Sequence, residues 1–73
     1  MTETPTDIEL CINGVPVRLA RGTTVQHWVD AEGLGGRRVA VEKNGIIVPR
    51  GRWSREVLDA GDRLEVVVAV GGG

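Results

Sequence analysis

The segment LEVVVAV at residues 64–70 is the most continuously apolar stretch of the chain, and the glycines GGG at residues 71–73 follow it directly. Side chains in a strand alternate between two faces, so this segment predicts a strand with two distinct faces. The core face is expected to hold Leu64, Val66, Val68 and Val70, and the opposite face Glu65, Val67 and Ala69. Because such a continuously apolar strand is typical of the middle of a sheet, we expect it to lie centrally, beside the first strand.

A β-hairpin is predicted near the N-terminus. Aliphatic residues occupy every second position first at Ile8, Leu10 and Ile12, and again at Val15, Val17 and Leu19. Between the two runs stands Asn13-Gly14, which favours a two-residue turn because both residues tolerate positive φ. Pro16 cannot donate a hydrogen bond, so its amide position is expected to face away from a neighbouring strand.

A short helix is predicted after the hairpin. Val25, Trp28 and Val29 have the spacing of one helical face. Either Thr23 or Thr24 could serve as the N-cap, and the glycines at 33, 35 and 36 are expected to end the helix.

The middle of the chain predicts three further elements. Val39 and Val41 indicate a third strand, Asn44-Gly45 a second tight turn, and residues 46–48 a short apolar segment that ends at Pro49. Residues 50–58 suggest a short 3₁₀ turn, and residues 59–62 a turn before the last strand.

This order of elements predicts an α+β fold of the β-grasp, ubiquitin-like type. The expected sheet is mixed and has four to five strands, with one main helix crossing it. The chain of 73 residues has room for one domain. We expect a disordered tail over residues 1–7, the β-grasp domain over residues 8–70 and a flexible glycine tail over residues 71–73.

Composition excludes several classes of protein. The formal net charge of −1 does not fit a nucleic-acid surface. A single cysteine, Cys11, cannot form an internal disulfide, which fits a protein of the reducing cytoplasm. Residues 1–7 are polar and the longest apolar run is short, so neither a signal peptide nor a membrane span is expected.

The sequence predicts neither an enzyme nor a metal site. Cys11 and His27 have no third group that clearly orients them, and no pair of cysteines or histidines has metal-ligand spacing. Trp28 and Trp53 are interpreted as core or lid residues. The arginines at 37, 38, 50, 52 and 55 are interpreted as a solvated face, with a partner-binding patch as the alternative.

The glycine tail is the one feature that points to chemistry. Without Cβ atoms, Gly71 and Gly72 could enter a narrow channel of a partner enzyme, and three extended residues reach about 10 Å. The carboxylate of Gly73 would become an acyl donor once ATP converts it to an adenylate, and a sulfur nucleophile could then displace AMP. The partner supplies the catalytic groups and uses the ATP, so we expect no cofactor bound by the domain itself.

The last strand also suggests where a partner would bind. A solvated face would be expected to carry more charge than Val67 and Ala69 provide. These residues lie just before the tail, so we predict that they contact the partner. The alternative is that the protein's own chain covers this face.

The chain resembles the ThiS family of sulfur carriers. The resemblance rests on 39-VAVEKNG-45, 47-IVPR-50, Trp53, 59-DAGD-62 and the closing Gly72-Gly73. It implies adenylation of Gly73 by a ThiF-like adenylyltransferase, conversion to a thiocarboxylate with sulfur from a donor such as a cysteine desulfurase, and delivery to a ThiG-like synthase that forms the thiazole of thiamin. The chain departs from the family pattern in its N-terminal extension and in the third glycine, Gly71.

Three other functions remain open at this point. A terminal Gly-Gly also occurs in MoaD, the sulfur carrier of molybdopterin synthesis, and in ubiquitin-like modifiers that are joined to lysine amines. The third alternative is an interaction module whose glycine tail has no role.

Overall fold

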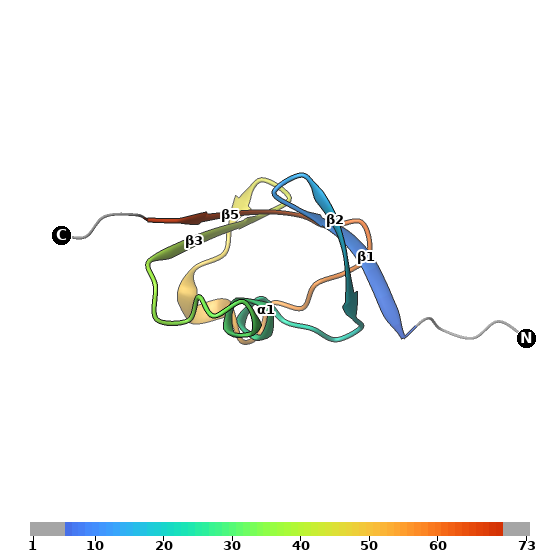
Figure 1. The fold of residues 1–73 in the computed structure, drawn as a ribbon, viewed down its shortest axis with the longest axis horizontal. Coiled ribbons are helices and arrows are strands. Elements are labelled where there is room, and N and C mark those ends of the chain that lie inside the picture. The colour runs from blue at the N-terminus through green and yellow to red at the C-terminus, as the bar shows by residue number, and fades with distance from the viewer. Residues whose placement is uncertain (1–5, 70–73) are drawn as a thin grey trace, which may run out of the picture.

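A computed structural model describes residues 6–69 of the protein (Figure 1). The predictions for residues 70–73 and for most of the 1–7 tail lie outside this range. The elements are β1 (Asp7–Ile12), β2 (Val15–Ala20), α1 (Val25–Ala31), β3 (Val39–Lys43), β4 (Ile46–Ile47), the 3₁₀ turn η1 (Arg50–Arg52) and β5 (Arg63–Val68). The strands form one layer and α1 lies across one of its faces (Figure 1).

The five strands form a mixed sheet in the order β2-β1-β5-β3-β4. Strand β5 pairs in parallel with β1 and antiparallel with β3, which confirms its predicted central place beside the first strand. The two hairpins β1–β2 and β3–β4 are antiparallel. The architecture is therefore the predicted β-grasp. Strand β1 begins at Asp7, which pairs with Ala20, so regular pairing starts one residue before the expected boundary at residue 8.

The core lies between α1 and the face of the sheet that α1 covers, which we call the inner face. Strands β1, β3 and β5 contribute Ile8, Leu10, Ile12, Val41, Leu64 and Val66. The helix and the segment after β4 contribute Val25, Val29, Val48, Trp53 and Leu58. Trp53 is only 1% exposed, and its indole Nε1 donates to the carbonyl oxygen of Val48 at 2.9 Å, so it is a core residue. The opposite, outer face of the sheet is open to solvent.

Helix α1 begins at one of the two candidate caps. The hydroxyl of Thr24 accepts a hydrogen bond from the backbone N–H of His27 at 3.1 Å, which makes Thr24 the N-cap. After the helix, Gly33 adopts a φ of +73°, as expected for a glycine that ends a helix. Val25 and Val29 are buried, as their spacing predicted.

Both Asn-Gly turns hold β5 with their asparagine side chains. Asn13 Nδ2 donates to the carbonyl oxygen of Val66 at 3.1 Å, and Asn13 Oδ1 accepts from the Val66 N–H at 2.7 Å. On the other side of β5, Asn44 Oδ1 accepts from the Arg63 N–H at 2.9 Å. Both asparagines have positive φ, of 52° and 53°. The turns therefore close the hairpins and also fix the position of the central strand.

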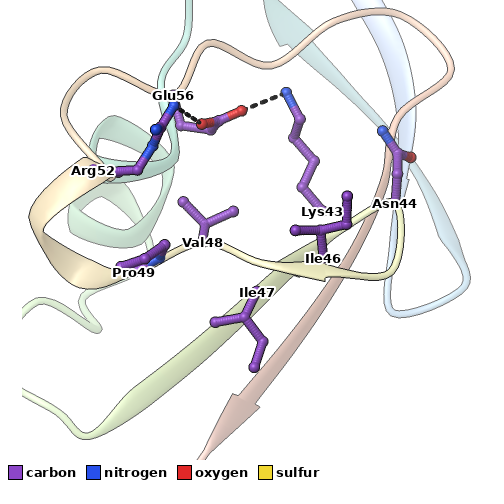
Figure 2. Close-up of a pocket in the computed structure, with 8 residues that line it drawn as sticks. All are labelled: Lys43, Asn44, Ile46, Ile47, Val48, Pro49, Arg52 and Glu56. Atoms are coloured by element: carbon purple, nitrogen blue, oxygen red, sulfur yellow. Dashed lines mark hydrogen bonds and ion pairs between the residues drawn. The ribbon is translucent and has the colours of Figure 1, made fainter.

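A charged cluster connects the β3–β4 hairpin to the segment before β5. The ammonium of Lys43 lies 2.8 Å from Glu56, and Arg52 lies 3.5 Å from Glu56 (Figure 2). Asp62 lies 3.7 Å from the same ammonium. The hydrogen bond from Lys43 holds the pKa of Glu56 below its ordinary value. The same hydrogen bond raises the pKa of Lys43. Each group thus stabilises the charged form of the other in the folded state.

Replacing Asn13 tests its contact with β5. Asn13→Gly keeps the backbone free to adopt positive φ but removes both hydrogen bonds to Val66, so the free energy of unfolding should fall by about 1–2 kcal/mol. Urea denaturation with an unchanged m value would measure the loss. Asn13→Asp retains the acceptor oxygen, so its free energy of unfolding should lie between those of the wild type and Asn13→Gly. An Asn13→Gly protein as stable as the wild type would show that the contact contributes nothing.

The Lys43–Glu56 pair predicts a pH dependence of stability. Because folding lowers the pKa of Glu56, its contribution is complete above the ordinary value of 4.5 and is lost as the pH falls through the lower folded value. Glu56→Gln should therefore reduce the free energy of unfolding by about 0.5–1 kcal/mol at pH 7, and this difference should disappear in acid below pH 4.5. The exposed Glu32→Gln is the control and should show no difference at either pH. A Glu56→Gln effect that persisted unchanged into acid would contradict the assignment.

Candidate functional site

The candidate site is the end of the sheet toward which β5 carries the chain. Strand β5 ends at Val68, and the N–H of Ala69 donates to the carbonyl oxygen of Arg38 at 2.9 Å. The chain is therefore still held against the loop before β3 at the last described residue. Gly71, Gly72 and Gly73, for which the sequence predicts the reactive tail, lie outside the described residues.

Val67 lies on the outer face, as the alternation of the strand predicted. It is 65% exposed and stands opposite Ala40 of β3, while its neighbour Val66 is buried in the core. Ala69 is also exposed. The alternative that the protein's own chain covers this face does not hold for Val67 within residues 6–69.

Strand β4 extends this apolar surface in a way that the sequence did not predict. Ile47 stands opposite Glu42 on β3, so it lies on the same face as Val67, and it is 67% exposed. We call the exposed apolar residues on the β3, β4 and β5 side of this face the outer-face strip, which consists of Ala40, Ile47, Val67 and Ala69. The face on which Ile47 lies could not be predicted from the sequence, because it depends on pairing with β3.

The five arginines do not form a single surface. Arg50 donates from Nη2 to the carbonyl oxygen of Arg37 at 3.0 Å and lies 4.6 Å from the ring centroid of Trp53. Arg38 holds Ala69, so Arg37, Arg38 and Arg50 gather near the end of β5. Within residues 6–69 none of these three forms an ion pair, whereas Arg52 pairs with Glu56 elsewhere. The arginines are therefore divided between the neighbourhood of Ala69 and the charged cluster around Glu56.

A groove of about 510 Å³ lies beside β4. Its lining includes Ile46, Val48 and Pro49 on one side and the Lys43–Glu56 pair on the other (Figure 2). Ile46 and Ile47 leave the β4 ribbon in opposite directions (Figure 2), and both line the groove, so Ile47 belongs to the groove as well as to the outer-face strip. The charged groups of the groove, Lys43, Arg52 and Glu56, pair with one another.

The described residues contain no catalytic or metal-binding constellation. Cys11 lies on the outer face of β1, between the buried Leu10 and Ile12, whereas His27 is exposed on α1 beneath the inner face. The two side chains are therefore on opposite sides of the sheet. Over residues 6–69 no three of the His, Cys, Asp and Glu side chains are placed to hold a metal ion. No helix in that range is long and apolar enough to cross a membrane.

Known proteins are similar to this chain in both fold and sequence. The crystal structure of the thiamine biosynthesis protein ThiS from Geobacter metallireducens matches with a TM-score of 0.75 and 28% identity, over 90% of this chain and 100% of that one. The uncharacterized protein ycf40 of Pyropia yezoensis is 34% identical over 92% of this chain and 94% of its own length.

A thiazole synthase of Paramagnetospirillum magneticum is 36% identical over 90% of this chain. The similarity covers 20% of that synthase, so this chain spans about a fifth of its length. The model of the ThiS family matches residues 10–73, which is most of the chain and includes the three closing glycines. The chain therefore belongs to the ThiS family, as its sequence predicted.

Proposed function

We propose that this protein is a sulfur carrier of thiamin biosynthesis, with the sulfur held as a thiocarboxylate on Gly73. The observation that carries the proposal is the match to the ThiS family, which extends through the glycine tail to residue 73. The placement of β5 supports it, because this strand leads from the centre of the sheet to the tail.

The chemistry begins with a carboxylate that is a poor acyl donor. A ThiF-like adenylyltransferase transfers AMP from ATP to the Gly73 carboxylate and releases pyrophosphate, which makes the acyl carbon electrophilic. The terminal sulfur of a persulfide on a donor such as a cysteine desulfurase then displaces AMP and forms an acyl disulfide. A thiol cleaves the S–S bond of this intermediate, which releases the thiocarboxylate and leaves a new disulfide. The protein serves as a cosubstrate, and its partners supply the catalytic groups and use the ATP.

The recipient of the sulfur is a ThiG-like thiazole synthase. Support comes from the thiazole synthases of Paramagnetospirillum magneticum and Magnetococcus marinus, each of which contains a segment 36% identical to this chain over a fifth of its length. In those proteins a segment similar to this chain belongs to the same polypeptide as the synthase. Such a linkage keeps two groups at high effective concentration and suits a carrier that delivers to that enzyme.

Docking of the partners uses the outer-face strip. Its members Val67 and Ala69 lie immediately before the tail, so a partner that grips them is placed to receive Gly71 and Gly72 in its channel. The exposure of Val67 leaves the strip accessible without unfolding of the domain.

The tail is tested by extending it. Adding one alanine after Gly73 should leave the fold intact and abolish thiocarboxylate formation with ATP, the ThiF-like enzyme and a sulfur donor, because no carboxylate remains at residue 73. Intact-mass spectrometry detects the exchange of one oxygen for sulfur, and an alanine added before Met1 is the control. Sulfur on the extended, untrimmed protein would refute the proposal, and branched peptides on lysines would favour a protein modifier.

The docking surface is tested by placing a charge on it. Val67→Asp should keep near-normal stability but weaken binding to the ThiF-like enzyme about tenfold or more, because the carboxylate would lose water at the interface without gaining a partner. Val15 is a matched control, since this β2 valine is 59% exposed and Val15→Asp should leave binding unchanged. If titration calorimetry showed that Val67→Asp and Val15→Asp bind equally well, Val67 would not be part of the interface.

A further inference from the structure

Two carboxylates stand directly opposite each other on the outer face of the sheet. Glu42 of β3 and Glu65 of β5 are cross-strand partners, and both are exposed. Like charges in directly opposed positions of an antiparallel pair destabilise a sheet. The central pairing of the fold therefore carries a repulsion that a neutral residue at either position would remove.

The same face shows the opposite arrangement elsewhere. Glu9 of β1 stands directly opposite Arg18 of β2, and the two form an ion pair at 2.8 Å. Within residues 6–69 neither Glu42 nor Glu65 forms an ion pair, although Arg63 lies on the same face two residues before Glu65. One strand pair on this face thus has its carboxylate neutralised, and the β3–β5 pair does not.

Apolar residues border the two carboxylates on two sides, and Arg63 lies on a third. Val67 and Ala40 form the next cross-strand pair toward the tail, and Ile47 stands opposite Glu42 on the outer side. A cation between the carboxylates would therefore contact apolar side chains as well as two acceptors. An arginine meets both requirements, because its stem packs on apolar surface and its planar guanidinium binds carboxylates with two parallel hydrogen bonds.

We infer that Glu42 and Glu65 receive an arginine of the activating enzyme when that enzyme docks on the outer-face strip. The inference rests on the proposed function and names the chemistry of its docking partner. The carboxylates are continuous with the strip, and Glu65 lies on β5, the strand that precedes the tail in the sequence.

Neutral variants of the two glutamates test the inference, because they should change stability and binding in opposite senses. Glu42→Gln with Glu65→Gln should raise the urea midpoint of unfolding, since it removes the repulsion. The same double variant should weaken binding to the purified ThiF-like enzyme by at least about tenfold, because the enzyme's arginine would lose its charged acceptors. Glu32→Gln, which removes one negative charge at an exposed position after α1, should leave the dissociation constant unchanged.

The outcomes separate this inference from the proposed function. Wild-type protein that acquires a thiocarboxylate, together with a double variant that binds the enzyme as tightly as wild type, would overturn the arginine contact alone. Failure of the wild type to acquire sulfur would overturn the proposed function.

Two other results would assign the glutamates to a different partner. If sedimentation showed that the wild type self-associates and the double variant does not, the glutamates would contact a second copy of this chain. If Ca²⁺ raised the unfolding temperature of the wild type but not that of the double variant, the two glutamates would bind a metal cation. Either of these last results would overturn the inference.

Discussion

Strand β5 is held from both sides, and the rest of the structure depends on that placement. Asn13 pairs its side chain with the main chain of Val66, and Asn44 does the same at Arg63 on the other side. Once β5 is fixed between β1 and β3, its even-numbered residues face α1 and its odd-numbered residues face solvent. The core, the outer-face strip and the direction in which the chain leaves the sheet all follow from this position.

Local patterns predicted most of the elements, because their causes are local. Alternation of apolar residues depends only on the two faces of a strand, and the Asn-Gly turns depend only on tolerance of positive φ. The asparagine side chains were missed because their partners are distant, as with Asn13 and Val66, which are 53 residues apart in sequence. The start of β1 at Asp7 was missed for a related reason, since a polar residue extends a strand when its partner, here Ala20, is in place.

The same distinction between local patterns and distant partners applies to the candidate site. The exposed position of Val67 could be predicted, because it follows from alternation within one strand. The pairing of Glu42 with Glu65 and the placement of Ile47 on the same face could not, because each depends on the register between strands. The arginines were treated as one surface, but the fold separates Arg52 from those near the end of β5. For Gly71–Gly73, composition and family membership remain the basis of the prediction.

The parallel pairing of β1 with β5 also has a kinetic consequence. Contacts between distant parts of a chain are slow to form, and the central strand of this sheet is the last of its elements to be synthesised. Until β5 pairs with β1 and β3, no strand lies between the two hairpins, and the aliphatic face of β1 is only partly buried. The surface of paired β3 and β5 residues exists only after this final step. An enzyme that recognises that surface would therefore act on chains that have completed folding and would pass over nascent or unfolded ones.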